Sequence, residues 1–333
     1  MWPKRYEPCR HLTEPAQPEP FPWRPSPDIH NEPVRTLASG AVMAQSSYLV
    51  GLIGSDTEGS LTVDLHEREA HRYNLRYLSR CVDTDGRAFR GEGMPGLLRA
   101  CRNFGFSGLR VAPPHRHSMA PYLDELSPSA ARLKAVDVIV FTRDGRTVGH
   151  STEVACRIAA MGRGLPGVPL SRVVQLGAGT DGIAVAHALL EKKVERLLVT
   201  DPAPDRARTL TRQLNQRAGR DWAQAFITEE LTVQLEEVDG LVNTLPSGKE
   251  GCLSAPLFAA LHKGLWIFDA HRHPFYSPLL RAGNALGCLV LDTDGVLVNE
   301  AAAAFQLVTG LIPHTSHMFG DFADIKAEPQ VHT

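Results

Sequence analysis

The sequence predicts an α/β fold built in two domains, and three observations lead to this prediction. The chain has 333 residues, which is about twice the usual length of a single domain. Hydrophobic residues make up 43% of it, which is enough for sizeable cores. From residue 47 onward, short apolar runs alternate with stretches of helical periodicity, and this order is typical of α/β proteins.

The N-terminal segment differs from the rest of the chain. Nine prolines fall within the first 33 positions, and no apolar period is visible there. A segment of this composition buries too little apolar surface to offset the entropy lost on folding. We therefore expect residues 1–43 to be a disordered proline-rich extension.

The first domain is expected to begin with a strand at 47–54, an apolar run that ends in glycine. Residues 60–78 follow with an amphipathic pattern that predicts a helix. The apolar positions of this pattern are Val63, Leu65, Ala70, Tyr73 and Leu78. Residues 108–112 and 136–141 predict two further strands, and residues 119–133 predict a helix between them.

The segment 172–201 carries the clearest signal. An apolar run, a glycine-rich turn, a helical pattern, a second apolar run and an acid follow one another, which is the order of a βαβ unit. Gly177 permits a tight turn, Gly179 lets the backbone approach a diphosphate, and Gly182 lets the helix pack on the strand. The helix N-terminus attracts the diphosphate, and Asp201 can accept both hydroxyls of an adenosine ribose. The segment therefore predicts a binding site for NAD.

The cofactor site predicted from this segment has eight residues. They are Gly177, Ala178, Gly179, Thr180, Asp181, Gly182, Asp201 and Arg206. A carboxylate at position 201 repels the 2′-phosphate of NADP, and the first arginine after the strand comes only at Arg206. We therefore expect NAD to be preferred.

The remaining second half repeats the alternation of strands and helices. Four apolar runs predict strands: 223–227, 240–244, 265–270 and 288–291. Residues 300–309 predict a final helix. His314 and His317 behind it are expected to lie in an exposed tail.

The composition limits the partners that the protein can have. Its formal net charge is −2, and no basic run suggests a nucleic acid. No stretch of 18 apolar residues, the length that could cross a bilayer, is found. The six cysteines lie far apart without the spacing of zinc ligands, which favours free thiols, a cytoplasmic location and no metal site. The expected partner is a small molecule.

Seven motifs point to one family. They are GLIG (51–54), SLTVDLHE (60–67), GLRVAPPHR (108–116), GHSTE (149–153), GAGTDG (177–182), VNTLPSG (242–248) and AFQLVTG (304–310). In their order and spacing the chain resembles the shikimate and quinate dehydrogenases from about residue 48 to 310, and most of all their NAD-preferring quinate/shikimate branch. The resemblance adds four residues to the expected cofactor site: Asn243, Thr244, Leu245 and Pro246.

The resemblance also implies a domain organisation and a reaction. A substrate-binding domain would span 44–152 and be completed by 296–333, and a Rossmann NAD-binding domain would span 153–295. The implied reaction is hydride transfer between NAD and a hydroxylated cyclic carboxylate, namely quinate, shikimate or a relative. The protein would act on this small cyclic hydroxy acid as a monomer or homodimer.

The chain departs from the family at the catalytic position. Where the family has Asn-Val-Thr-x-Pro-x-Lys with a catalytic lysine, this chain has Arg116, and a guanidinium cannot relay a proton. The family's partner aspartate is replaced by Glu153. The resemblance implies an ion pair between Arg116 and Glu153, with Glu153 or His115 as the candidate base. An ordinary ion pair in a relict site is the alternative.

Other departures fall where the family holds substrate hydroxyls. Asp137, Arg272 and Glu300 align with an asparagine, a tyrosine and a glutamine of the family. A carboxylate only accepts hydrogen bonds, so Asp137 and Glu300 would reject some groups and favour others, such as an amine. Arg110 also replaces an asparagine, and a simple salt bridge between Arg110 and Asp137 is the alternative to a role in substrate binding.

Two function classes follow from these matches and departures. Ser60 and Thr62 match the family's carboxylate-binding hydroxyls, although both could instead cap the following helix. Their retention, together with Glu153 and the intact βαβ unit, favours an NAD-dependent dehydrogenase of the quinate/shikimate type. Four changed residues favour the alternative, a catalytically impaired NAD-binding regulator or pseudoenzyme of the same fold: Arg116, Asp137, Arg272 and Glu300.

Overall fold

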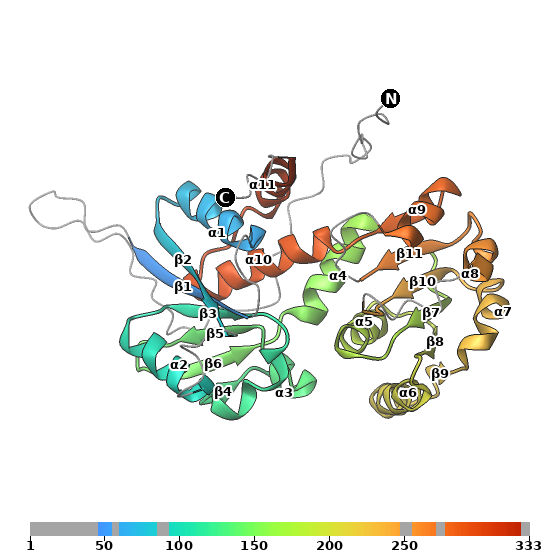
Figure 1. The fold of residues 1–333 in the computed structure, drawn as a ribbon, viewed down its shortest axis with the longest axis horizontal. Coiled ribbons are helices and arrows are strands. Elements are labelled where there is room, and N and C mark those ends of the chain that lie inside the picture. The colour runs from blue at the N-terminus through green and yellow to red at the C-terminus, as the bar shows by residue number, and fades with distance from the viewer. Residues whose placement is uncertain (1–45, 55–59, 85–92, 247–254, 271–276, 328–333) are drawn as a thin grey trace, which may run out of the picture.

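The computed structural model describes residues 46–54, 60–84, 93–246, 255–270 and 277–327. Two six-stranded sheets, each covered by helices, form two lobes (Figure 1). This arrangement confirms the predicted α/β fold with two domains. The predicted extension 1–43 lies outside the described residues.

The first sheet mixes parallel and antiparallel strands. Its strands are β1 (Ser47–Gly54), β2 (Arg76–Asp83), β3 (Gly108–Val111), β4 (Glu125–Leu126), β5 (Val138–Phe141) and β6 (Thr147–His150). They lie in the order β2-β1-β3-β5-β6-β4. β1 pairs in parallel with β2 and β3, whereas β5 runs antiparallel to β3 and β6.

Helices from both ends of the chain cover this sheet. They are α1 (Leu61–Arg72), α2 (Gly93–Asn103), α3 (Pro128–Leu133), α10 (Asp294–Thr309) and α11 (Thr315–Ala327), with the 3-10 turns η2 (His115–His117) and η3 (Ala120–Tyr122). Because side chains alternate along a strand, Val138 and Val140 of β5 belong to the cluster with Leu307 of α10. Ile139 points the other way, into the cluster with Leu98 of α2.

The second sheet is parallel throughout. Its strands are β7 (Arg172–Leu176), β8 (Arg196–Thr200), β9 (Ala223–Ala225), β10 (Gly240–Asn243), β11 (Trp266–Asp269) and β12 (Leu289–Leu291). In the order β12-β11-β10-β7-β8-β9, the strand that comes first in the chain, β7, lies in the middle. The chain adds β8 and β9 on one side of β7 and then crosses to add β10, β11 and β12 on the other side. This is the strand order of the Rossmann fold, whose ligands bind at the carboxyl ends of the strands beside this crossing.

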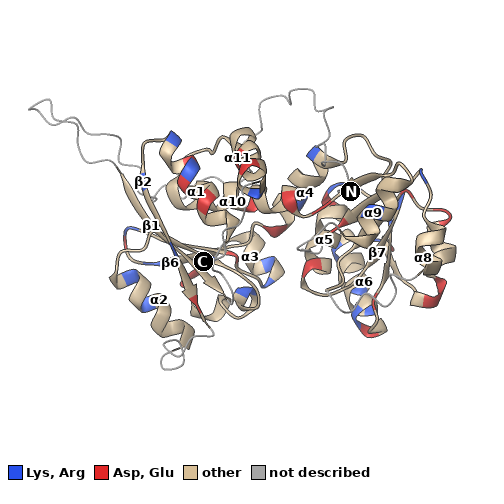
Figure 2. Ribbon diagram, turned by 45° about the horizontal axis from the view of Figure 1, so that its top comes forward, with Lys and Arg blue, Asp and Glu red and all other residues tan. Residues whose placement is uncertain are grey.

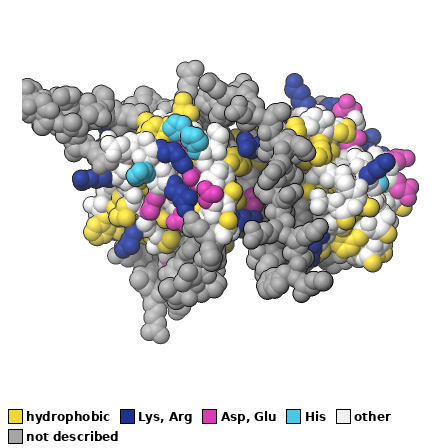
Figure 3. Space-filling view, turned by 90° about the horizontal axis from the view of Figure 1, so that it is seen from above, with side chains coloured by type: hydrophobic (Ala, Val, Ile, Leu, Met, Phe, Trp, Pro, Cys, Tyr) yellow, Lys and Arg dark blue, Asp and Glu magenta, His cyan; other side chains and the backbone are white. Residues whose placement is uncertain are grey.

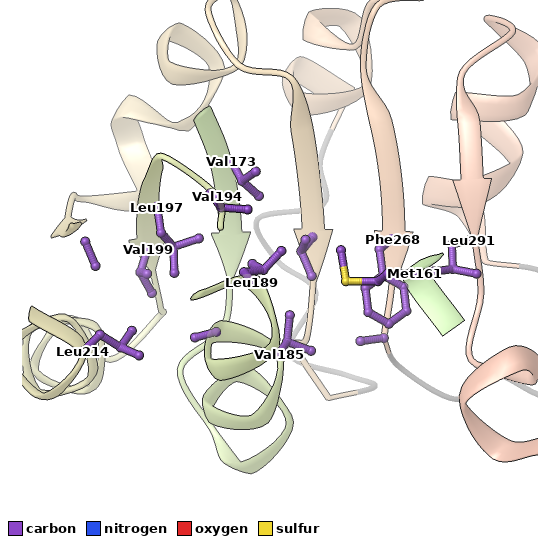
Figure 4. Close-up of a cluster of buried hydrophobic side chains, with 14 of the residues drawn as sticks. Met161, Val173, Val185, Leu189, Val194, Leu197, Val199, Leu214, Phe268 and Leu291 are labelled. Carbon is purple, nitrogen blue, oxygen red and sulfur yellow. The ribbon is translucent and has the colours of Figure 1, made fainter. Parts of the chain in front are cut away.

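Six helices and one 3-10 turn accompany the second sheet. They are α4 (Glu153–Gly164), α5 (Thr180–Glu191), α6 (Pro204–Ala218), α7 (Leu231–Leu235), α8 (Ala255–Ala260) and α9 (Pro278–Ala285), with η4 (Thr228–Glu230). Figure 4 shows Val185 and Leu189 of α5 beside Val173, Val199 and Leu197 of the sheet. All five are fully buried, so this strand-helix layer forms the core of the lobe.

Helices α4 and α10 pack on each other where the two lobes meet (Figure 1). α4 starts at the first lobe, directly after β6, and adds Met161 to the core of the second sheet. Figure 2 shows charged positions along α4 at this junction. Residues at the start of α4 therefore stand between the two sheets. The predicted domain boundaries at 44–152, 153–295 and 296–333 stay predictions.

The helix predicted at 60–78 is shorter than expected. α1 ends at Arg72, and the prediction was wrong for Leu78, which lies in the edge strand β2. Asn74 adopts a left-handed conformation with φ 53°, which ends the helix and turns the chain into the strand. Leu78 is largely exposed on this edge, so its helical spacing with Leu65 was coincidental.

The helix predicted at 119–133 is also wrong over most of its length. Only α3 (Pro128–Leu133) is an α-helix, preceded by η3 and the short strand β4. The side chain of Ser127 accepts a hydrogen bond from the N–H of Ala130 and so starts α3 where Pro128 fits the first turn. Strand β6 (Thr147–His150) was not predicted.

The C-terminal region is more ordered than the sequence suggested. α10 begins at Asp294, six positions before the predicted start, and α11 follows it. His314 is not in a free tail, because its backbone N–H and its Nδ1 both contact Oε1 of the buried Glu69, at 2.6 and 3.0 Å. The ring of His317 stacks on that of His314. Figure 3 shows histidine, basic and acidic side chains together on one face of the first lobe.

Candidate active site

The glycine-rich turn between β7 and α5 has the geometry that a dinucleotide requires. Gly177 has φ +97°, and a Cβ on it would lie 2.5 Å from Oγ1 of Thr244. A Cβ on Gly182 would lie 2.4 Å from the carbonyl oxygen of Gly177. A Cβ on Gly179, in contrast, would meet no atom within 4 Å. The first and third glycines are therefore required by the fold, whereas the second borders open space at a helix N-terminus, where a diphosphate fits.

Asp201 follows β8 directly and faces this turn. Its Oδ2 accepts a hydrogen bond from the N–H of Ala178 and its Oδ1 accepts one from the N–H of Ala203, both at 2.8 Å. A carboxylate offers about four lone-pair sites, so capacity remains for the hydroxyls of a ribose. The free acceptor capacity at this position fits the adenosine ribose of a nicotinamide dinucleotide.

The other predicted cofactor residues surround the same turn. Thr180 and Asp181 begin α5, and Arg206 lies exposed in the first turn of α6. The hydroxyl of Thr244 donates to the carbonyl oxygens of Leu176 at 2.8 Å and Gly177 at 3.1 Å, and so braces the turn.

The residues after β10 are held in place by the Asn243 side chain. Its Nδ2 donates to Oδ1 of Asp269 at 3.0 Å, and its Oδ1 accepts from the N–H of Leu245 at 3.2 Å. Pro246 is exposed behind them. The predicted contacts of Asn243, Leu245 and Pro246 with the cofactor stay predictions.

Sequence analysis missed Gln175, which braces the turn from below. Its Nε2 donates to the carbonyl oxygens of Gly177 at 2.8 Å and Gly182 at 2.9 Å, and the side chain is fully buried. The signal was available, because an amide in an otherwise apolar strand needs a buried partner.

The predicted ion pair between Arg116 and Glu153 is present. NH1 of Arg116 donates to Oε1 of Glu153, and Nε of Arg116 donates to the carbonyl oxygen of Val111 at 3.0 Å. The side chain of Glu153 is 2% exposed. η2 carries Arg116 from the first lobe, and Glu153 is the first residue of α4, so the pair lies where the lobes meet.

Glu300 of α10 joins this pair to a second arginine. Its Oε2 accepts from NH2 of Arg110 at 3.3 Å and lies 3.6 Å from NH2 of Arg116. Arg110 therefore pairs with Glu300, whereas a salt bridge of Arg110 with Asp137 was the expected alternative. Nε of Arg110 is buried without a hydrogen-bond partner, as is the hydroxyl of Ser151.

Asp137 directly precedes β5, and its carboxylate is hydrogen-bonded to Thr152, the residue before Glu153. Its carboxylate accepts hydrogen bonds from the N–H of Thr152, at 2.9 and 3.1 Å, and from the Thr152 hydroxyl at 2.5 Å. These bonds fix the start of α4, and with it the position of Glu153. Direct contact of Asp137 with substrate stays a prediction.

Electrostatics distinguish the two buried groups. Burial opposes the charge of Arg116, but the carboxylates of Glu300, Glu153 and Asp137 outweigh it and raise the pKa of this guanidinium. Burial raises the pKa of Asp137 to about 6, although Arg116 opposes this shift. Arg116 is therefore a permanent cation, and Asp137 is a carboxyl that titrates near neutral pH.

Asp137→Asn should change the pH dependence of stability. The pKa of Asp137 rises from 3.8 to about 6 on folding, so the folded state keeps a proton that the unfolded state loses, and this group makes stability fall as pH rises from about 4 to 6. Asparagine removes this titration, and its carbonyl can still accept from Thr152. Between pH 4 and 7 the variant should gain on the order of 1–3 kcal/mol relative to the unsubstituted protein. Denaturant titrations at both pH values measure this, and identical pH profiles would contradict it.

The remaining predicted residues are spread around this cluster. Nε2 of His115 lies 2.8 Å from Oγ1 of Thr84. Ser60 stands at the N-cap position of α1, but its side chain makes no capping hydrogen bond, and Thr62 is buried in the first turn. The helix-capping alternative for the Ser60 hydroxyl is therefore not realised. Arg272 lies outside the described residues.

The described ranges hold neither a grouped set of metal ligands nor a membrane-spanning helix. Among the residues placed between 46 and 327, no three His, Cys, Asp or Glu side chains are grouped as a metal site would need. Within the same part of the chain, no helix is long and apolar enough to cross a membrane.

Comparison with known proteins places these features in one family. The family model "Shikimate dehydrogenase substrate binding domain" matches residues 52–139. A shikimate dehydrogenase (NADP(+)) of Streptomyces avermitilis is 44% identical over 284 residues, which are 85% of this chain and 97% of that protein. A quinate/shikimate dehydrogenase (NAD(+)) of Corynebacterium efficiens is 36% identical over 287 residues, covering 85% and 100%.

A solved structure shows the same likeness. Quinate dehydrogenase from Corynebacterium glutamicum in complex with NAD matches with a TM-score of 0.77 and 34% sequence identity. The match covers 84% of this chain and 100% of that chain.

Proposed function

The chain belongs to the shikimate dehydrogenase family, and we propose that it is an NAD-dependent dehydrogenase of the quinate/shikimate type. Its substrate would be a hydroxylated cyclic carboxylate, namely quinate, shikimate or a relative. The observation that carries this proposal is the Arg116–Glu153 pair, which joins the substrate lobe to the first residue of α4 beside the Rossmann sheet. The protein is an oxidoreductase by family, so the proposal concerns its cofactor and its substrate.

NAD is the proposed cofactor because of Asp201. Its buried carboxylate faces the glycine-rich turn and would repel a 2′-phosphate. The relatives differ in this respect, since the Streptomyces avermitilis protein is named for NADP(+) and the Corynebacterium efficiens protein for NAD(+). The preference therefore rests on the residues of this chain.

The residues of this chain would divide the chemistry as follows. Bound at the glycine-rich turn, NAD would supply the acceptor for the hydride of the ring carbon that carries the reacting hydroxyl. Arg116 holds the oxygen by charge-assisted hydrogen bonds as negative charge develops on it. Glu153 is the proposed acceptor of the hydroxyl proton, and because it is held in an ion pair with Arg116 it would accept that proton less effectively than a lysine relay. Ser60 and Thr62 bind the substrate carboxylate.

Gly179→Ala and Gly177→Ala should separate binding from folding. A Cβ at Gly179 meets no protein atom, so the alanine variant should keep its melting temperature but bind NADH at least tenfold more weakly. A Cβ at Gly177 would clash with Thr244 at a positive φ, so that variant should lose roughly 1–3 kcal/mol of stability. Thermal melts and NADH titrations measure both effects. Unchanged NADH affinity in Gly179→Ala would contradict the assigned diphosphate position.

The direct test of the proposal is a substrate panel. NADH formation is followed with quinate, shikimate and their amino-substituted analogues, with NADP as the alternative cofactor. We expect turnover with at least one cyclic hydroxycarboxylate and NAD. NADH binding without turnover of any of them would reject the proposal.

A second function is a catalytically impaired NAD-binding regulator. The observation that favours it is the state of Arg116, a buried cation held by Glu153 and near Glu300, which cannot release a proton. The regulator would bind NADH with normal affinity and show no turnover in the panel above.

The proposed function also has a proposed cellular location and oligomeric state. We place the protein in the cytoplasm, as a monomer or homodimer. Four cysteines among the described residues are free thiols, which suits a reducing compartment: Cys81, Cys101, Cys156 and Cys288.

A further inference from the structure

Arg157 lies one helical turn after Glu153 and contacts both candidate functional regions. Its NH1 donates to the carbonyl oxygen of Glu153 at 3.1 Å, and its NH2 donates to Oδ1 of Asp181 at 2.8 Å. The side chain of Arg157 is 5% exposed, whereas that of Asp181 is 47% exposed. One guanidinium thus bridges the first turn of α4 and the first turn of α5.

The two partners of Arg157 link the expected cofactor site to the expected catalytic site. Asp181 lies within the glycine-rich turn, between Thr180 and Gly182, at the helix end where a diphosphate would bind. Glu153 starts α4, and its carboxylate pairs with Arg116. A shift of the turn would therefore be transmitted to Glu153 through Arg157, because a buried guanidinium that lost either partner would leave donors unsatisfied.

The charge of Asp181 also links the ion pair to diphosphate binding. A lone carboxylate at Asp181 would repel a diphosphate bound at this helix end, but pairing with Arg157 offsets its charge. A bound diphosphate would fix the position of the glycine-rich turn, and with it the carboxylate of Asp181 that pairs with Arg157. Binding and positioning are thus linked through one ion pair.

We propose that Arg157 and Asp181 form a tie through which dinucleotide binding fixes the position of Glu153. Arg157 is a positioning residue in this view, since it acts through Glu153 and the turn. The inference rests on the proposed function, because it needs a dinucleotide at the glycine-rich turn.

Hydrogen exchange with and without NADH tests the tie without requiring turnover. NADH is supplied at ten times the dissociation constant of each variant. In the unsubstituted protein we expect NADH to slow amide exchange at least threefold in peptides covering 177–183 and 151–160. In Asp181→Ala the protection should persist at 177–183 and disappear at 151–160.

Asp294→Ala is the matched control. Asp294 is also an acid in the first turn of a helix, and it pairs at 2.5 Å with Lys326 of α11, which belongs neither to the glycine-rich turn nor to α4. This variant should keep both protections. Arg157→Met should lose the protection at 151–160 that NADH gives the unsubstituted protein. Arg157→Lys, which retains a cation on α4, should keep part of that protection.

The outcomes separate the tie from the proposed function. Protection at 151–160 that survives in Asp181→Ala, or that never appears in the unsubstituted protein while 177–183 is protected, would overturn the tie alone. If NADH protects neither segment of the unsubstituted protein, the cofactor assignment fails and the tie fails with it. A melting temperature that falls in Asp181→Ala without loss of the linkage would show a merely structural ion pair.

Discussion

Arg116→Lys combined with Asp137→Asn should raise NADH formation with shikimate or quinate by roughly 100-fold to 10,000-fold, which is the usual contribution of general acid–base catalysis. A lysine can lose its proton when a dry site and a nearby cofactor lower its pKa, whereas the guanidinium of Arg116 keeps its proton at any working pH. Glu153 can pair with either side chain, so the change replaces one cation by another that can relay a proton.

The second substitution is needed because Asp137 stands where the family places an amide. Burial raises the pKa of Asp137 to about 6, so it is charged at the pH of most assays. Asparagine at 137 removes this charge, and its carbonyl oxygen can still accept the N–H of Thr152. We therefore expect Arg116→Lys alone to gain less than the double variant, and Asp137→Asn alone to gain least.

Initial rates of NADH formation measure this series, with NADH affinity as the control for folding. A double variant that binds NADH normally and still forms no NADH would reject a family-like substrate. The regulatory function would then take the place of the dehydrogenase. A gain in Arg116→Lys equal to that of the double variant would show that Asp137 acts only through Thr152.

The strongest sequence signals proved reliable because they are local. The βαβ unit at 172–201 was predicted with its glycines, because a tight turn, a close helix and a terminal acid all follow from neighbouring residues. The pairing of Arg116 with Glu153 was also expected, although it came from a family resemblance. Nothing local links two residues that η2 and α4 bring together.

The failures have physical causes that a sequence pattern does not contain. Leu78 continued a helical spacing, but the left-handed turn at Asn74 ended α1 first. His314 looked like part of a polar tail because its partner, Glu69, lies 245 positions earlier in the chain. A salt bridge with Asp137 was one of two alternatives for Arg110, but α10 places Glu300 within reach of Arg110 instead. Long-range contacts of charged side chains therefore remained beyond the sequence.

Asp201 should give the protein a strong preference for NADH over NADPH. The protein should bind NADH at least tenfold more tightly than NADPH, which corresponds to about 1.4 kcal/mol. The buried carboxylate of Asp201 accepts hydrogen bonds from the N–H groups of Ala178 and Ala203 and faces the turn, so a 2′-phosphate brought to it would meet a like charge. The chain offers no arginine between this acid and Arg206 to compensate.

Asp201→Asn tests the cause of this preference. The amide oxygen can still accept one of the two backbone N–H groups, but the charge is gone, so the ratio of the two dissociation constants should fall at least tenfold. Asp205→Asn is the control, because Asp205 is exposed and pairs with Arg208, three positions further on. This variant should leave the ratio unchanged. Fluorescence titrations with NADH and NADPH give both constants. Equal constants in the unsubstituted protein would contradict the preference for NADH, and would mean that the carboxylate of Asp201 serves the turn rather than the ribose.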